Sequence, residues 1–398
     1  MLTTTAYPPS TGGVQAHVEE LRRRLKSFEA DVVTMWLRNR TDWLLGTTLR
    51  LAGPPLTEVA PGVTALAWSR ATRARMAPWV ASYYSAPRLV AKRIAAEMVP
   101  YLDRAISPDH VLIHNHRIGR EFLAQASLEV ARRRGIPFVL TPHHHPKWRG
   151  RRYAGWTDVY RAADAVLVLT NTELKELEQM GVDARRMHVI GGAADPPQPG
   201  DAGRFRAQIG GSGRPIVLFL GQQYEYKGVA ELVTAVDSLR SRGLECELVF
   251  LGPPTPFSTR FFASHTRPWV HVLGMVDDQT KWDAIQASSV VCVPSRHEAF
   301  GRVFLEAWSM GKAVIGGRIP AVQEVITEGQ TGLLVDPRSS QELAAALSRV
   351  LNDHELAQRL GANGAREVAG RFSWDTVIGR VESVYRALLE EQTKRRDG

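Results

Sequence analysis

With 398 residues, the chain is too long for one ordinary hydrophobic core, and its composition (44% hydrophobic, 23% charged) is that of a globular protein. No apolar run reaches the ~18 residues of a membrane span, and MLTTTAYPPSTGG at the start lacks the features of a signal peptide. The net charge of +9 falls entirely in residues 1–195, with 27 Lys+Arg against 18 Asp+Glu, while residues 196–398 carry 23 of each.

The first half alternates short apolar runs with helical segments. MLTTTAYP is a short strand, and GGVQAHVEELRRRLKSFEA is a helix opened by Gly12 and Gly13. Further strands are expected at 110–115, 137–142 and 164–170. Residues 40–100 show no clear pattern. The Pro/Gly-rich segment 191–203 is the expected linker between the two halves.

The second half repeats this alternation more regularly. Strands are expected at 215–221, 245–252, 269–274, 288–295, 312–317 and 331–337. Helices are expected between them, for example at 229–243. Apolar runs of this length between helices indicate a parallel sheet buried on both faces. The final segment from residue 373 predicts one amphipathic helix with a charged tail.

These elements predict an α/β fold of two Rossmann-like, doubly wound domains, residues 1–195 and 196–373. The helix 374–398 is expected to pack back on the first domain. If the carboxyl ends of the two sheets face each other, they form a cleft of the kind in which α/β proteins bind ligands. Cys246 and Cys292 lie in strand-like runs and are expected to be buried thiols in a reducing, cytoplasmic compartment.

RHEAFGRVFLEAW (296–308) places two carboxylates on either side of a Phe-Gly pair. Glu298 is expected in the loop after a buried strand, and Glu306 in the helix that follows. Near such a helix start, backbone N–H groups favour anions, and Gly301 allows a ligand to approach closely. The two carboxylates suit a ligand with hydroxyls at both ends, such as a nucleotide sugar. The plain alternative is that Glu298 caps the helix and Glu306 is merely exposed.

Two other loops leave the same predicted sheet edge. GQQYEYKG (221–228) follows a strand and brings Lys227, whose ammonium can neutralise a phosphate. The segment 316–335 begins with Gly316 and Gly317 at a turn, and Glu324 is expected to start a helix.

Together these segments resemble the retaining glycosyltransferases of family 4, which have the GT-B fold. The match covers most of the chain and is strongest from about residue 215 to 336. The resemblance implies that Glu298 contacts the hydroxyls of the donor sugar and that Glu306 contacts the nucleotide ribose. It also implies that the segment of Ala299, Phe300 and Gly301 binds the donor through backbone amides.

The resemblance assigns further roles. It implies that Lys227 binds the donor diphosphate. It also implies that Gly12 and Gly13, in the glycine loop of YPPSTGGVQAHVEEL (7–21), face the donor diphosphate and the acceptor. In IHNHRIG (113–119), it implies that His116 lies near the reacting sugar. One departure is Gln222, which stands where the family usually has Arg, so phosphate binding would depend more on Lys227.

The histidines also allow a metal reading, from His114, His116 and the run His143 to His145. Three consecutive side chains do not all converge on one ion without distorting a strand end, and no carboxylate stands at ligand spacing. The resemblance implies metal-independent catalysis. We therefore expect histidines of a cleft wall or core, and neither a metal nor another cofactor.

The predicted function is transfer of a hexose-type sugar, with retention, from a UDP- or GDP-sugar. The expected acceptor is a lipid-linked or polysaccharide intermediate of cell-envelope glycan synthesis, bound on the basic first half. The stretch 70–93 mixes Arg and Lys with Trp79, Tyr83 and Tyr84, which suits a surface helix on the anionic inner face of the plasma membrane. A packed helix with exposed arginines is the alternative. No recognisable nucleic-acid module is present, so no nucleic-acid partner is expected.

Three other functions share this fold or site. A sugar-nucleotide epimerase would consume the donor without an acceptor. A phosphorylase would need a pyridoxal-bearing lysine and usually a longer chain. A non-catalytic sugar-nucleotide-binding protein would bind the donor without turnover, which Gln222 leaves open.

Overall fold

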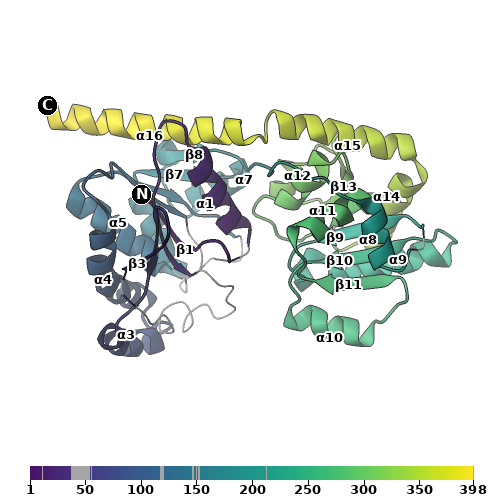
Figure 1. The fold of residues 1–398 in the computed structure, drawn as a ribbon, viewed down its shortest axis with the longest axis horizontal. Coiled ribbons are helices and arrows are strands. Elements are labelled where there is room, and N and C mark those ends of the chain that lie inside the picture. The colour runs from purple at the N-terminus through teal and green to yellow at the C-terminus, as the bar shows by residue number, and fades with distance from the viewer. Residues whose placement is uncertain are drawn as a thin grey trace. The chain divides into compact units, whose positions relative to one another are not determined.

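The computed structural model describes residues 1–10, 12–36, 54, 56–116, 121–145, 148, 150, 153–211 and 213–397. It divides into two compact units, Met1–Gly191 with Val377–Gly398, and Gly192–Thr376. Each unit is built on one sheet, and Figure 1 labels the elements. The predicted junctions at residues 195 and 373 lie a few residues from these bounds.

The N-terminal unit has an eight-stranded sheet. Its strands, in spatial order, are β3 (Leu56–Ala60), β4 (Val63–Leu66), β2 (Val32–Trp36), β1 (Leu2–Ala6), β5 (Ile113–His116), β6 (Phe138–Thr141), β7 (Ala165–Val168) and β8 (Met187–Val189). Neighbours are parallel except β3 and β4. That pair is joined only by Pro61 and Gly62, and such a short loop enforces an antiparallel hairpin. Gly62 has a φ of 67°, which suits glycine.

The helices of this unit include α1 (Gly13–Arg24), α3 (Arg70–Ser82), α4 (Pro87–Ala105), α5 (Phe122–Arg134), α6 (Ala154–Ala162) and α7 (Asn171–Gln179). The stretch 70–93 forms two helices, α3 and the start of α4, and not one surface helix. Tyr83 between them is buried, and its hydroxyl donates to Glu121 Oε1 at 2.8 Å. Tyr84 is 51% exposed, so the aromatic residues of this stretch do not share one outer face.

The last helix, α16 (Trp374–Asp397), groups with the N-terminal unit from Val377 onward. The buried Glu382 carboxylate accepts from the backbone amides of Lys26 at 2.6 Å and Ser27 at 2.8 Å. It also accepts from Arg386 at 2.9 Å. Burial alone would raise the pKa of Glu382, but these bonds outweigh it, and the pKa is lowered from its ordinary value of 4.5.

Replacing Glu382 with glutamine should therefore destabilise the packing of α16 by about 1–2 kcal/mol at neutral pH, because charge-assisted bonds become neutral ones. Since the folded-state pKa is lowered, the stabilising contribution is present above the ordinary value of 4.5 and is lost as pH falls through the folded-state value. Urea unfolding midpoints of wild type and variant should converge in acid. Glu391→Gln, on the same helix but 64% exposed, is the control, and an equal effect there would contradict this role.

The C-terminal unit has a six-stranded, fully parallel sheet. Its spatial order is β11 (Val270–Gly274), β10 (Glu247–Leu251), β9 (Ile216–Leu220), β12 (Val290–Val293), β13 (Ala313–Gly317) and β14 (Leu333–Val335). This is the doubly wound arrangement that the alternating apolar runs predicted. The chain order reverses between β9 and β12, where Val217 lies beside Val290. Ligands of open α/β sheets bind at the carboxyl ends of the strands at such a reversal.

Helices lie on both sides of this sheet (Figure 1). They are α8 (Ala202–Gln208), α9 (Val229–Ser241), α10 (Pro256–Ser264), α11 (Asp278–Ala287), α12 (Arg302–Ser309), α13 (Pro320–Gln323), α14 (Ser340–Asn352) and α15 (His354–Ala369). α9 packs beside α14, and α12 packs beside α15. The expectation that Glu324 starts a helix is wrong: Pro320 begins the one-turn α13, and Glu324 is its C-cap. Proline favours the first helical turn because its missing N–H is not needed there.

Both cysteines are buried free thiols, as predicted. Burial raises the pKa of Cys246 to about 11 and raises that of Cys292 further, so both thiols are neutral at physiological pH. In the part of the chain that the structure describes, no helix is long and apolar enough to span a bilayer.

Candidate active site

Two loops meet at the reversal point of the C-terminal sheet. Residues 221–228 follow β9, and residues 294–301 follow β12. The backbone N–H of Arg296 donates to the carbonyl of Tyr226 at 2.8 Å and ties the loops together. The side chain of Arg296 adds a bond to the Glu225 carbonyl at 3.1 Å. The two loops that the sequence singled out therefore form one structure.

Lys227 and Glu298 are in direct contact in this structure. The Lys227 ammonium donates to Glu298 Oε1, and Ser295 Oγ donates to the same oxygen at 3.2 Å. The side chains are 17% and 12% exposed, so the pair is partly buried but open to a ligand. The Lys227 Nζ also lies 5.8 Å from the ring centre of Tyr226. Burial, and then the Glu298 carboxylate, raise the pKa of Tyr226, so its phenol stays protonated.

The carboxylate of Glu298 does not cap α12, contrary to the plain alternative. The N-cap is Gly301, with a φ of 91° and no side-chain cap. The ring of Phe300 is buried, and its centre lies 5.8 Å from that of Phe372. Only the backbone of this segment, which includes Ala299, is therefore suited to contact a ligand. The backbone N–H groups and the helix dipole at the start of α12 favour an anion there.

Glu306 lies in the second turn of α12 and is 14% exposed, so the alternative of a merely exposed carboxylate is wrong. Its Oε1 is 3.7 Å from the Nζ of Lys281 on α11. The same ammonium lies 4.8 Å from the ring centre of Trp282. Sequence reasoning did not identify Lys281, because nothing in its helix separates it from an ordinary surface lysine. Only the packing of α11 reveals its place.

Gln222, which replaces the arginine usual in the resembling family, has an exposed side chain at the end of β9. Its carbonyl accepts from the Tyr224 amide at 2.8 Å. The next residue, Gln223, is buried, and its Nε2 donates to the Gly252 carbonyl at 3.2 Å. Gln222 is thus the residue of this pair that faces outward.

The other predicted site residues belong to the N-terminal unit. Gly12 is the N-cap of α1 and Gly13 its first residue, and both are exposed. His116 ends β5 and is fully buried. Its neighbour His114 uses both ring nitrogens, one with the Tyr385 hydroxyl at 2.5 Å and one with Thr141 Oγ1 at 2.7 Å. Residue 11 of the predicted glycine loop (7–21) and residues 117–119 of the segment 113–119 lie outside the described residues.

Three histidines gather around the end of β5. Ring nitrogens of His17, His116 and His143 all lie within 4.8 Å of one another. The run 143–145 does not converge as a whole, as predicted, because the rings of His144 and His145 lie 6.2 and 5.5 Å from that of Trp148. Sequence reasoning missed His17. The signal that could have found it is its place on the same buried face of α1 as Val18 and Leu21.

Burial lowers the pKa of His116 well below its ordinary value, and the neighbouring histidines lower it further. His116 is therefore neutral at physiological pH. Its imidazole can donate one hydrogen bond and accept another, but carries no charge.

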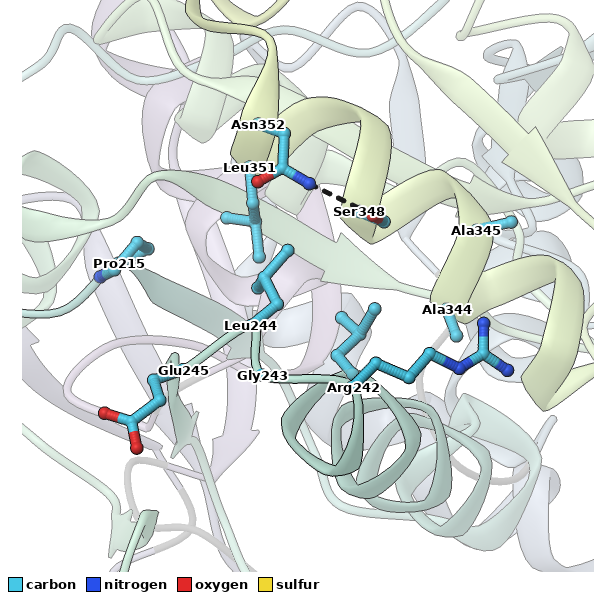
Figure 2. A pocket seen from close by; sticks show the side chains of 11 residues that line it. Pro215, Arg242, Gly243, Leu244, Glu245, Ala344, Ala345, Ser348, Leu351 and Asn352 are labelled. Carbon is cyan, nitrogen blue, oxygen red and sulfur yellow. Dashed lines mark hydrogen bonds between the residues drawn. The ribbon is translucent and has the colours of Figure 1, made fainter.

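A cavity of about 750 Å³ lies elsewhere in the C-terminal unit (Figure 2). It is lined by Pro215, Leu239, Arg242, Gly243, Leu244, Glu245, Ala344, Ala345, Ser348, Leu351 and Asn352. Pro215 precedes β9 and Glu245 precedes β10, so the cavity lies at the amino ends of the strands. The Lys227–Glu298 pair lies at the carboxyl ends. The cavity is therefore separate from the candidate site.

Comparison with known proteins covers both units. Residues 203–367 match the family model "Glycosyl transferases group 1", and residues 12–193 match "Glycosyl transferase 4-like domain". The chain is 29% identical over 297 residues to an alpha-D-kanosaminyltransferase of Streptomyces kanamyceticus, covering 69% of this chain and 77% of the relative. It is 27% identical to a D-inositol 3-phosphate glycosyltransferase of Acidothermus cellulolyticus, covering 96% and 87%.

The fold is similar to that of Anabaena HepE. The structure of HepE with UDP aligns with a TM-score of 0.73 at 17% identity, covering 97% of this chain and 100% of HepE. A structure of HepE with UDP and glucose aligns with a TM-score of 0.71. At this level of identity, the similarity establishes the fold only.

Proposed function

The chain belongs to the group 1 glycosyltransferases of the GT-B type, and on that basis we propose a reaction for it. The protein transfers a hexosyl unit from a UDP- or GDP-sugar to an acceptor hydroxyl, with retention of the anomeric configuration. One observation carries the proposal: a lysine and a glutamate in contact at the reversal point of a doubly wound sheet.

The residues suit the parts of such a donor. Lys227 and the amides at the start of α12 supply positive charge for the diphosphate. Glu298 accepts hydrogen bonds from the sugar hydroxyls, and Glu306 accepts them from the ribose. In this structure Lys227 and Glu298 bond to each other. When the donor binds, each is expected to exchange or share its partner with the ligand. The similar structure of HepE with UDP supports a nucleotide ligand of this kind.

The chemistry requires stabilisation of the leaving nucleoside diphosphate. Negative charge grows on its oxygens as the glycosidic bond breaks, and a fixed ammonium at that place lowers the barrier. Lys227 is the residue for this role, so the proposal includes no metal cofactor. Glu298 orients the sugar and does not attack it. His116 is proposed to bond to the sugar or to the incoming acceptor hydroxyl.

The acceptor is proposed to bind the N-terminal unit, and to be a lipid-linked or polysaccharide intermediate of cell-envelope glycan synthesis. The positive charge of residues 1–195 supports an anionic acceptor, and the name of the inositol phosphate glycosyltransferase gives one relative that acts on such a compound. Tyr84, before α4, and Leu89, Lys92 and Arg93 on α4 are all exposed, and this mixture of apolar and basic side chains supports a peripheral contact with anionic lipid.

A ligand screen tests the proposal. UDP or GDP should raise the unfolding temperature, by an amount equivalent to about 2.7 kcal/mol at a hundred times the Kd. Transfer is then measured with the matching sugar donor, using soluble glycans and lipid-linked acceptors in anionic vesicles. NMR of the product reports the anomeric configuration, and an inverted product would contradict retention. Consumption of the donor without acceptor would favour an epimerase, and binding without turnover would favour a non-catalytic protein.

A further inference from the structure

The three clustered histidines of the N-terminal unit are close enough to share one ion. Their ring nitrogens lie within 4.8 Å of one another, so a point exists within about 2.8 Å of all three. This exceeds an ordinary Zn–N bond of about 2.0–2.1 Å by only about 0.7 Å. Small rotations of the side chains would close that difference. Each residue comes from a different element: α1, the end of β5, and the segment after β6.

His116 is the residue whose chemistry calls for a ligand. It is fully buried, and within the described residues neither of its ring nitrogens has a hydrogen-bond partner. Leaving a buried polar group without a partner is costly, so such groups are usually matched by protein, water or an ion. His114, whose ring centre is 4.0 Å away, has both nitrogens engaged and does not supply the partner.

His143 has an unusual backbone conformation, which fixes the direction of its side chain. Its φ of 45° is the only positive φ of a non-glycine residue in the described part of the chain. Such conformations are costly and persist where the surrounding structure holds them, often at functional sites. At this residue the conformation brings the ring within 5.3 Å of His17 and 5.9 Å of His116, centre to centre.

We propose that His17, His116 and His143 form a binding site for a divalent transition-metal ion, with Zn²⁺ as the best fit. Neutral imidazole is a preferred ligand of Zn²⁺, and three histidines with a fourth position open to water or another ligand are a known zinc arrangement. Mg²⁺, Ca²⁺ and Mn²⁺ prefer oxygen ligands, and this trio has none. The site is therefore distinct from a magnesium site for a diphosphate.

Binding of the ion would have a consequence for activity, and this part rests on the proposed function. A metal that takes a nitrogen of His116 removes that nitrogen from hydrogen bonding to sugar or acceptor. Zn²⁺ should therefore inhibit transfer. This inhibition is consistent with the proposed reaction, which uses no metal. The ion would block His116 and would take no part in the transfer itself.

The binding test uses Co²⁺ and the tag-free, full-length protein. Co²⁺ should give the visible absorption bands of a tetrahedral complex, and Zn²⁺ should abolish them by competition. Elemental analysis after dialysis against Zn²⁺ should give one ion per chain. His17→Gln and His143→Gln should each weaken Co²⁺ binding by at least about tenfold, because loss of even an outer partner of a metal ligand costs 10–100-fold.

His145→Gln is the matched control, since its ring lies against Trp148 and outside the trio. It should keep the Co²⁺ bands. The unfolding temperatures of the metal-free variants establish that each is folded. Absence of the bands in wild type would overturn the site, and so would equal bands in the folded His17→Gln and His143→Gln proteins.

The activity test separates the site from the proposed function. The Zn²⁺ concentration that halves transfer should rise in His143→Gln in parallel with the loss of Co²⁺ binding. If Zn²⁺ binds to the trio but transfer is unchanged, the inhibition is refuted while the site stands. If wild type transfers no sugar with or without chelator, the proposed function fails, and the Co²⁺ bands still decide the metal site.

Discussion

Replacing Lys227 with alanine should lower the turnover of sugar transfer by about ten- to a hundredfold, because a charge-assisted hydrogen bond contributes about 1.5–3 kcal/mol. The reason is its place in the site. The ammonium lies at the carboxyl edge of the sheet, is 17% exposed, and is held by Glu298. Charge on the leaving diphosphate grows during bond cleavage, so loss of the ammonium should lower kcat at saturating donor. Steady-state kinetics measure kcat, and titration calorimetry with UDP or GDP measures nucleotide affinity.

Lys312→Ala is the control for this prediction. Lys312 belongs to the same unit, and its Nζ donates to the Gln286 carbonyl at 2.7 Å. It immediately precedes β13, so it lies at the amino edge of the sheet, opposite the candidate site. Its removal should leave kcat within about twofold of wild type, since it makes no contact in the proposed site. Unchanged turnover in Lys227→Ala would refute the role of that lysine.

Replacing Gly228 with alanine should destabilise the C-terminal unit by about 2–4 kcal/mol and weaken donor binding. Gly228 has a φ of 81°, and a Cβ there would lie 2.7 Å from both Cγ and the carbonyl oxygen of Pro294. It directly follows Lys227, and Pro294 directly precedes Ser295. Any shift that relieves the clash separates the two loops and moves the ammonium away from Glu298. Urea unfolding measures the loss of stability, and nucleotide titration measures the loss of donor affinity.

Gly243→Ala separates backbone strain from the clash. Gly243 has a similar φ of 88°, but nothing lies within 4 Å of a Cβ built there. Its replacement should cost only about 1 kcal/mol and leave donor affinity unchanged. Equal destabilisation by the two substitutions would show that the close approach of Gly228 to Pro294 does not hold the loops together.

The sequence alone determined the α/β class and the doubly wound C-terminal sheet. Short apolar runs between amphipathic helices can be buried only as parallel strands covered on both faces. The same pattern placed Lys227 and Glu298 after strands, because loops that follow parallel strands leave one sheet edge. Both inferences depend on local pattern, which is why they needed no coordinates. Local pattern failed at α13, because a helix of four residues is too short to show a helical repeat of apolar residues. Pro320 begins this helix, and Glu324 does not.

Only the tertiary structure decided which side chains meet. Lys227 contacts Glu298 across 71 residues of sequence, and Lys281 reaches Glu306 from another helix. His17 joins His116 and His143 because α1 packs at the end of β5, while the rings of His144 and His145 turn toward Trp148. Local sequence sets the face of each element that is buried. The partner that this face meets is set by long-range packing, which no local pattern encodes.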